Sequence, residues 1–246
     1  MDGWCSVEDL TRLGFARSSV VMANEAHSGL LRCVRTREVG VRMIQAAHQA
    51  GVRRLAMEAL PSSANETPEP IREIPSIDDG YLAQPEMRRL IATALELGWT
   101  LWAYEARIDF RKSESERLSL EFTNWREREQ AKNLCRLVSA APEDPLLVWC
   151  GNGHASKKKT DDGWIPMGYH FAAMSGIEPF VIDQDITVDF TGQGPDTWVR
   201  DLLAELDGIL AAHGGCAGIL REQAPPPLDC LLAADGIVVS TENELT

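Results

Sequence analysis

The sequence predicts an α/β fold, a single domain over residues 1–246 with a mostly parallel central sheet, helices on its faces and a cleft at the carboxyl ends of the strands. Short apolar runs alternate with helical segments, which is the pattern of βαβ units. The runs are apolar throughout rather than alternating, as expected for strands that are covered on both faces. Two of them, Val20–Ala23 and Leu146–Cys150, lead into small-residue loops that end in His27 and His154.

The elements follow one another in a regular order. We expect strands at Val20–Ala23, Arg54–Glu58, Trp99–Tyr104, Leu146–Cys150, Pro179–Asp183 and Gly236–Ser240. We expect helices at Ser28–Gly51, Pro85–Leu97, 114–140, Met167–Ser175 and Thr197–Ala212. Gly51 and Gly98 stand where a helix C-terminus favours glycine. Residues 62–80 are rich in Pro, Asn, Ser and Asp and lack periodicity, which predicts a long loop of the kind that often serves as a lid.

Composition narrows the class of partner. The net charge of −13 argues against nucleic acid or an anionic membrane as the main partner, since both require a basic surface. No stretch approaches the roughly 18 uninterrupted apolar residues of a membrane span. The six cysteines are scattered without a CxxC pair, and the N-terminus lacks the layout of a secretory signal. We therefore expect a cytoplasmic protein whose main partner is neither nucleic acid nor a membrane, while the charge does not bear on a small-molecule substrate.

Polar side chains follow four of the predicted strands. They are Glu25 and His27 after the first strand, Glu58 after the second, Glu105 after the third, and Asn152 and His154 after the fourth. The carboxyl ends of parallel strands meet at one edge of a sheet, where such folds build their sites. Clustered carboxylates and imidazoles shift one another's pKa values toward neutrality, as general acids and bases require. The sequence thus predicts an enzyme with a His/Glu cleft.

Other interpretations of these residues stay open. His27, His154, Glu25 and Glu58 are also a ligand set for a divalent metal that activates water. Glu105 can instead pair with Arg107 or Arg111, and Asn152 suits a tight turn.

Three further histidines and one lysine run have simpler explanations. His48, His170 and His213 fall in or beside predicted helices, where a structural role is expected. The run Lys157–Lys159 predicts a solvated loop, although its place three residues after His154 would also suit an anionic substrate.

An ordered series of short motifs resembles the erythromycin esterase/ChaN-like superfamily, to which the TraB and Tiki-type proteins are related. The motifs are Ala23-Asn24-Glu25-Ala26-His27-Ser28-Gly29, Ala56-Met57-Glu58, Arg126-Glu127-Arg128-Glu129-Gln130-Ala131-Lys132-Asn133, Val148-Trp149-Cys150-Gly151-Asn152-Gly153-His154-Ala155 and Met167-Gly168. The resemblance covers roughly residues 18–185. It implies a parallel-sheet α/β fold with a deep cleft at the strand ends.

The resemblance also implies roles for individual residues. By analogy with the esterase branch, His27 is the general base, oriented by Glu25 and Glu58. Arg126 faces the cleft, although its helical charge pattern alone indicates a solvated face. Asn152 and His154 polarise or bind the substrate carbonyl. In the Tiki-like branch the corresponding motifs serve a metal-dependent peptidase, and ChaN is linked to haem binding, so a metal or haem is the implied cofactor where one is used.

The sequence departs from the esterases at several points. Asn24-Glu25 replaces the usual Gly-Glu, the Glu-x-His spacing of Glu25 and His27 is ChaN-like, and Gly151 stands where the esterases commonly carry histidine. The large helical insert of the esterases is missing, so macrolide specificity does not carry over. We expect a hydrolase acting on an ester, lactone or amide. The alternatives are a metal-dependent peptidase, a haem- or ligand-binding protein, and an acid/base enzyme of specialised metabolism that does not hydrolyse.

Overall fold

The computed structural model describes residues 3–25, 34–58, 60, 69–74, 81–107, 113–151, 153–187, 197–226, 228 and 234–240. The strands are β1 (Trp4–Ser6), β2 (Val20–Glu25), β3 (Arg54–Met57), β4 (Thr100–Ala103), β5 (Leu146–Gly151), β6 (Phe180–Thr187), β7 (Cys216–Leu220) and β8 (Gly236–Ser240). The helices are α1 (Val7–Arg17), α2 (Val34–Gln49), α3 (Pro85–Glu96), α4 (Glu114–Arg117), α5 (Leu120–Ala140), α6 (Met167–Ser175), α7 (Thr197–Glu205) and α8 (Asp207–Ala212), with short 3-10 turns at Tyr81–Ala83 and Arg221–Gln223.

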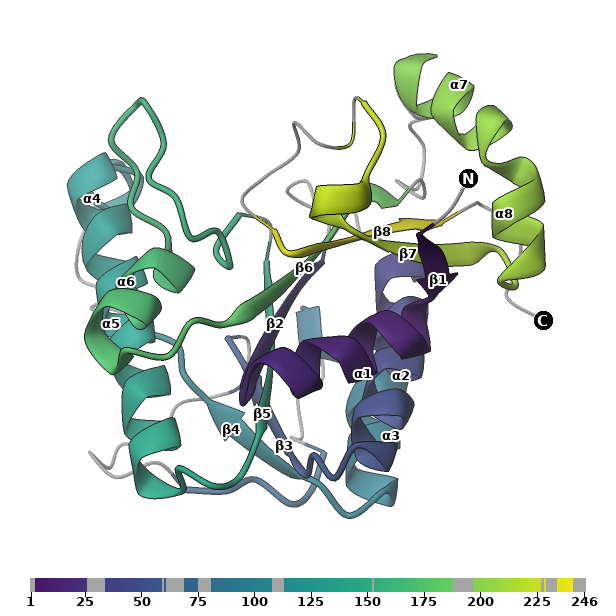
Figure 1. The fold of residues 1–246 in the computed structure, drawn as a ribbon. Coiled ribbons are helices and arrows are strands. Elements are labelled where there is room, and N and C mark those ends of the chain that lie inside the picture. The colour runs from purple at the N-terminus through teal and green to yellow at the C-terminus, as the bar shows by residue number, and fades with distance from the viewer. Residues whose placement is uncertain are drawn as a thin grey trace.

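The eight strands within the described residues form one sheet, in the order β1-β7-β8-β6-β2-β5-β3-β4 (Figure 1). The strands from β8 to β4 pair in parallel, and β7 pairs antiparallel with both β1 and β8. The expected α/β fold with a mostly parallel sheet is therefore confirmed. The strands β2 and β5, which lead to the two histidine loops, lie side by side at the centre.

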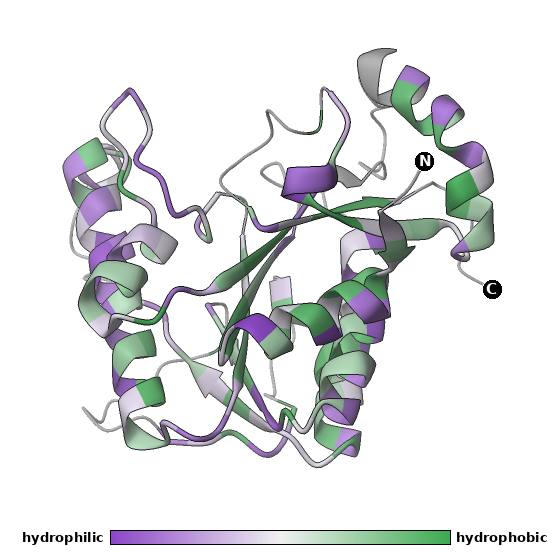
Figure 2. Ribbon diagram, in the orientation of Figure 1, coloured by the Kyte–Doolittle hydropathy of each residue, from purple (hydrophilic) through white to green (hydrophobic). Residues whose placement is uncertain are grey.

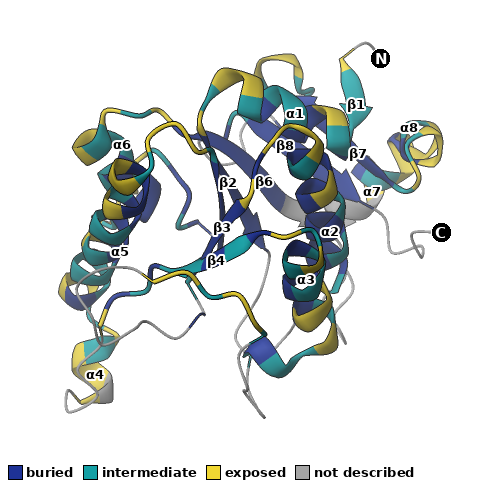
Figure 3. Ribbon diagram, turned by 90° about the horizontal axis from the view of Figure 1, so that it is seen from below, coloured by how far each residue is buried: buried dark blue, intermediate teal, exposed yellow. Residues whose placement is uncertain are grey.

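Helices cover both faces of the sheet. Helices α1, α2 and α3 lie on one face, and α5 and α6 lie on the other, as Figures 1 and 3 show. Along β2, Val21 and Ala23 belong to the core under α1–α3, whereas Val20 and Met22 belong to the core under α5 and α6. Every residue of β2, β3 and β5 is buried, which explains why these strands are apolar without alternation (Figures 2 and 3). Helices α7 and α8 pack on β7 and β8 through a smaller cluster around Leu206 and Ile219.

Each of the six predicted strands is present, and β6 runs on to Thr187. The structure adds three elements that the sequence analysis did not predict: β1, α1 and β7. Strand β1 is only 3 residues long and half-buried, so it carries little apolar signal. Strand β7 has Gly218 at its centre, where Leu10 of α1 approaches so closely that a Cβ would lie 2.9 Å from it. Glycine in a strand often marks such a close approach.

Two helices that the sequence predicts as continuous are divided. The segment 114–140 forms α4 and α5, because the Ser119 hydroxyl accepts a hydrogen bond from the Phe122 amide at 3.2 Å and so caps a new helix. The segment 197–212 forms α7 and α8, which meet at Leu206. Helix α2 is described from Val34 onward, and residues 28–33 of the predicted helix lie outside the described residues.

The predicted loop 62–80 is described only in part. Within it, Ile71 forms an antiparallel bridge with Leu101 of β4. Among the described helices, none combines the length and the apolar character that a bilayer crossing requires. Cys5, Cys135, Cys150 and Cys216 are free thiols.

Candidate active site

The sheet register aligns the ends of the two strands that precede the predicted histidine loops. Strands β2 and β5 pair in parallel from Val20 opposite Leu146 to Glu25 opposite Gly151, so their carboxyl ends are level. His154 lies in the turn directly after β5. His27 and Asn152 lie outside the described residues. The described part of the site is therefore built around His154, Glu58 and Glu105.

Arg126 of α5 connects the ends of two strands. Its Nε donates to Glu105 Oε1 at 3.0 Å, its Nη2 donates to Glu58 Oε1 at 3.2 Å, and it also bonds Glu105 Oε2. Gln130, one helical turn further on, donates to Glu105 Oε1 at 3.1 Å. Arg126 is thus directed toward the sheet edge. The family resemblance implied this orientation, whereas the charge pattern of the helix alone indicated a solvated face.

Glu58 is held in its ionised form. Burial acts most strongly on it and would raise its pKa, but the charges of His154 and Arg126 and hydrogen bonds from Arg126 and the Gly151 amide outweigh burial and lower that pKa. The Gly151 amide donates to Glu58 Oε2 at 3.2 Å. A carboxylate with a lowered pKa is a weak base, so this environment suits Glu58 to stabilising positive charge.

His154 forms a buried ion pair with Glu127 of α5. Its Nδ1 lies 2.6 Å from Glu127 Oε1, and the side chain of Glu127 is completely buried. The other oxygen of Glu127 accepts from the Met167 amide at 2.7 Å. Burial by itself would lower the pKa of His154, but the contact with Glu127 and the charges of Glu58 and Glu127 outweigh both burial and Arg126 and raise that pKa. His154 is therefore stabilised as an imidazolium.

The turn that carries His154 is held by backbone contacts. Gly153 has φ of 75°, a left-handed conformation that glycine adopts without strain. The Gly168 amide at the start of α6 donates to the His154 carbonyl at 2.8 Å. A Cβ on Gly168 would lie 2.1 Å from the Ala155 carbonyl oxygen, so α6 can pack this closely only with glycine there. The Trp164 ring meets the imidazole edge-on, with 5.9 Å between ring centroids.

Glu25 lies on the opposite side of the sheet from this cluster. It continues the β2 face of Val21 and Ala23, under α2 and α3. Both of its oxygens accept from Arg37 of α2 at 3.2 Å, and Oε2 also accepts from Trp149 Nε1 at 2.9 Å. The side chains of Glu25 and Arg37 are each 1% exposed. This carboxylate is thus already bound within the protein.

Three polar residues of α5 extend the set that the sequence analysis proposed. They are Glu127, Gln130 and Asn133; the last donates to the carbonyls of Tyr104 and Glu105 and so fixes the chain beyond β4. A signal for this face was present: Arg126, Gln130 and Asn133 recur at helical spacing. For Glu127 no comparable signal exists, since it lies among alternating charges.

The lysine run is not simply a solvated loop. Lys157 Nζ bonds both oxygens of Asp235, at 2.9 and 2.8 Å, and lies 2.9 Å from Glu178. It therefore connects the turn after β5 to the segment before β8. Lys158 and Lys159 are exposed.

Of the metal ligands that the sequence suggests, His27 lies outside the described residues, so only part of that set can be compared with a metal or haem site. Nowhere in the described ranges do three His, Cys, Asp or Glu side chains gather so as to hold a metal ion. Arg126 already neutralises Glu58 and Glu105, and its positive charge would repel a cation. The His154 side chain is only 14% exposed and is surrounded by charged groups, whereas a porphyrin needs an apolar surface.

Comparison with known proteins shows the fold. No family model matches the sequence, and no curated protein matches it. Among solved structures, a Bacillus cereus protein has a TM-score of 0.55 at 11% identity, over 96% of this chain and 92% of that chain. ChaN of Campylobacter jejuni, solved with cofacial haem, has a TM-score of 0.52 at 12% identity, over 96% of this chain and 92% of that one.

The fold is ChaN-like. Two further structures have lower TM-scores. The type III effector HopBA1 has a TM-score of 0.45 at 18% identity, over 78% of this chain and 88% of that chain. A bacterial protein toxin has a TM-score of 0.48 at 14% identity, over 73% of this chain. The chain spans 36% of the length of that toxin.

Proposed function

We propose that this ChaN-like protein is a hydrolase that directs water against an ester, lactone or amide carbonyl of a small molecule at the carboxyl ends of β2, β3 and β5. The observation that supports this most is the pairing of His154 with buried Glu127 beside Glu58, Arg126 and Glu105. These charged groups belong to separate segments that converge on one strand edge, where α/β folds bind ligands.

In this proposal His154 acts on the substrate oxygen. Its raised pKa keeps the imidazolium populated, so it donates a hydrogen bond to the carbonyl oxygen as negative charge develops there. A single preorganised donor of this kind contributes about 3 kcal/mol to transition-state stabilisation. The same proton can then pass to the leaving group.

Glu58 and Arg126 supply the electrostatic frame. Their side chains are 19% and 24% exposed, so they are accessible to a ligand in a way that Glu25 and Arg37 are not. Arg126 can bind a substrate oxygen with the guanidinium N–H groups that do not bond Glu58 or Glu105. Glu105 and Gln130 position Arg126, and Glu58 stabilises the imidazolium of His154.

The general base in this proposal is His27. The lowered pKa of Glu58 makes this carboxylate a weak base, and His154 serves as the proton donor in this proposal, so we assign the base role to the second histidine that the sequence places after β2. His27 takes a proton from water, and the hydroxide formed attacks the carbonyl carbon.

Turnover of a panel of chromogenic aryl esters, lactones and anilides tests the proposal. We expect His27→Ala and His154→Ala each to abolish turnover while the melting temperature of His27→Ala stays close to that of the wild type. Arg88→Gln, which changes an exposed arginine on α3, is the matched control and should retain full activity. Full activity in His27→Ala would overturn the assignment of the base.

The cofactor alternatives are tested on the same protein. Elemental analysis after purification without added metal, followed by assay under exhaustive chelation, separates metal-free chemistry from a Tiki-like metal mechanism. Loss of turnover on chelation, restored by a divalent ion, would contradict the metal-free proposal. A Soret band on haem titration that His154→Ala removes would favour a haem-binding role like the one in the ChaN structure instead.

A further inference from the structure

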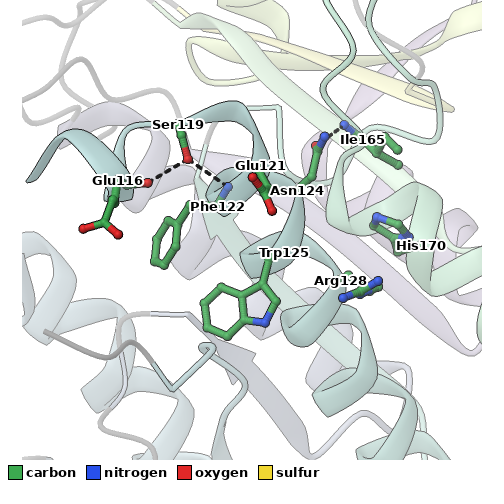
Figure 4. A pocket seen from close by; sticks show the side chains of 9 residues that line it. All are labelled: Glu116, Ser119, Glu121, Phe122, Asn124, Trp125, Arg128, Ile165 and His170. Carbon is green, nitrogen blue, oxygen red and sulfur yellow. Dashed lines mark hydrogen bonds between the residues drawn. The ribbon is translucent and has the colours of Figure 1, made fainter. Parts of the chain in front are cut away.

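A cavity lies between α5 and α6. It has a volume of about 680 Å³ and is lined by Glu116, Ser119, Glu121, Phe122, Asn124, Trp125, Arg128, Ile165 and His170 (Figure 4). Arg126, Gln130 and Asn133 of the same helix do not line the cavity and bond the residues that follow β4 instead. The cavity is therefore separate from the cluster around His154.

Hydrogen bonds fix the walls of this cavity. The Asn124 side chain accepts from the Ile165 amide at 2.8 Å and donates to the Gly163 carbonyl at 3.0 Å, which connects α5 to the segment before α6. Ser119 accepts from the Phe122 amide and donates to the Glu116 carbonyl at 2.7 Å, which fixes the junction of α4 and α5 (Figure 4). The cavity is thus shaped by the fold itself.

Aromatic side chains supply one surface of the cavity. The rings of Phe122 and Trp125 are adjacent, with 5.1 Å between centroids and a 37° angle between planes. Phe122 is largely buried, and Trp125 is partly exposed on the outer face of the helix. A tryptophan at such a position offers a flat apolar surface on which an aromatic ring of a ligand can stack.

Arg128 and His170 lie next to each other at one end of the cavity (Figure 4). Arg128 is exposed and makes no hydrogen bond or ion pair with any residue that the structure describes. The Nε2 atom of His170 is buried and has no hydrogen-bond partner in the described part of the chain. In a protein with a net charge of −13, an arginine beside an unsatisfied imidazole nitrogen is a local site for an anion.

We propose that this cavity binds a small aromatic anion, with its ring on Trp125 and Phe122 and its carboxylate or phosphate on Arg128 and His170. The volume is in the usual range for a small-molecule site. Glu116 and Glu121 also line the cavity and repel negative charge, so they confine the anionic group of the ligand to the end that Arg128 and His170 form. The site is independent of the hydrolytic function proposed above.

Calorimetric titration with matched naphthalene derivatives tests the proposal. We expect naphthoate or naphthyl phosphate to bind saturably. Naphthylmethylammonium should bind much more weakly because its charge is positive, and acetate should bind much more weakly because it has no aromatic ring. Preference for naphthoate assigns the ligand as a carboxylate, and preference for naphthyl phosphate assigns it as a phosphate. Equal binding of the ammonium compound, or no saturable binding of either anion, would overturn the proposal.

Variants locate the binding to this cavity. Arg128→Gln should weaken anion binding about tenfold, the effect of one charge-assisted hydrogen bond, while Arg88→Gln on α3 should leave it unchanged. Trp125→Leu should weaken the binding of naphthoate while leaving the binding of acetate as weak as before. Equal effects of Arg128→Gln and Arg88→Gln would contradict the assignment.

The pKa of His170 gives a second measurement. Burial, Arg128 and Lys159 lower this pKa, and Glu127 opposes them. An anion bound beside the imidazole favours its protonated form, so an NMR titration of His170 should show a higher pKa with naphthoate than without it. An unchanged pKa at saturating naphthoate would contradict the proposed contact with His170.

Discussion

At the scale of single residues, two arginine–glutamate systems with similar chemistry have opposite surroundings. Arg37 and Glu25 are each 1% exposed, whereas Arg126 and Glu58 are 24% and 19% exposed. A sealed ion pair is fully satisfied within the protein and cannot bind a substrate, while a partly exposed pair can exchange a protein contact for one with a ligand. Exposure therefore favours a stabilising role for Glu25 and supports the proposed role of Glu58 in the candidate site.

Removal of the charge on Glu25 should destabilise the protein strongly. Glu25→Gln leaves the buried guanidinium of Arg37 without its counter-ion, so we expect the free energy of unfolding to fall by about 3 kcal/mol. Asp9→Asn breaks the solvent-exposed Arg12–Asp9 pair and should change it by less than about 1 kcal/mol. Urea denaturation of both variants provides the comparison, and equal effects would contradict the distinction between the two pairs.

Glu127 should control the protonation of His154. Glu127→Gln removes the negative charge beside Nδ1 but keeps an oxygen that can accept from the Met167 amide. We expect the pKa of His154, followed by NMR, to fall in this variant, and the pH above which turnover declines to fall with it. Unchanged values of both would show that Glu127 does not hold the imidazolium.

At the scale of elements, helix α5 contributes residues to both proposed sites. One face directs Arg126, Glu127 and Gln130 toward the strand ends, and the other face carries Phe122, Trp125 and Arg128. The 3.6-residue period of the helix separates the two sets in space although they interleave in sequence. Helix α6 completes both sites, since Met167 and Gly168 hold Glu127 and the His154 turn, and His170 lies in the outer cavity.

The contact between α6 and the His154 turn can be tested with one methyl group. Gly168→Ala places a Cβ 2.1 Å from the Ala155 carbonyl oxygen, so we expect a loss of about 1–3 kcal/mol in stability and a loss of turnover. Gly208→Ala in α8 meets nothing within 4 Å and should stabilise the protein by roughly 0.5 kcal/mol. Thermal unfolding distinguishes the two, and a neutral Gly168→Ala would contradict the close approach.

At the scale of the whole molecule, the site couples the stability of the fold to pH. The pKa of His154 is raised in the folded state. Its contribution to the free energy of unfolding is therefore complete at pH values below the unfolded pKa, and it is lost as pH rises through the folded pKa. The pKa of Glu58 is lowered, so its contribution is present above its unfolded pKa of roughly 4 and is lost as pH falls through the folded value.

The difference in free energy of unfolding between wild type and Glu127→Gln should therefore decrease as pH rises. We expect this difference to be largest in mildly acidic solution, where His154 is protonated in both the folded and unfolded states. It should shrink as pH rises through the folded pKa of His154. Denaturant unfolding across a pH series measures this difference, and one that grew with rising pH would show the opposite sign of coupling.

Most of the sheet could be predicted from local patterns. Apolar runs bounded by glycine and polar residues predicted β2, β3, β4, β5, β6 and β8, because strands buried on both faces must be apolar throughout. The short β1 and the glycine-centred β7 carry too little hydrophobic signal for the same argument. The capping serine Ser119 lies within a continuous helical pattern, so the break between α4 and α5 depended on its hydrogen bond with the Phe122 amide.

The position of each acidic or imidazole residue directly after its own strand was enough to predict that such side chains lie where the parallel strands end. Which of them contact one another depends on how the strands and helices pack. The order β2-β5-β3-β4 and the placement of α5 brought Glu58, Glu105 and His154 to Arg126 and Glu127. The alternation of side chains along β2 turned Glu25 to Arg37 on the other face. Such contacts join residues far apart in the chain, and local periodicity holds no information about them.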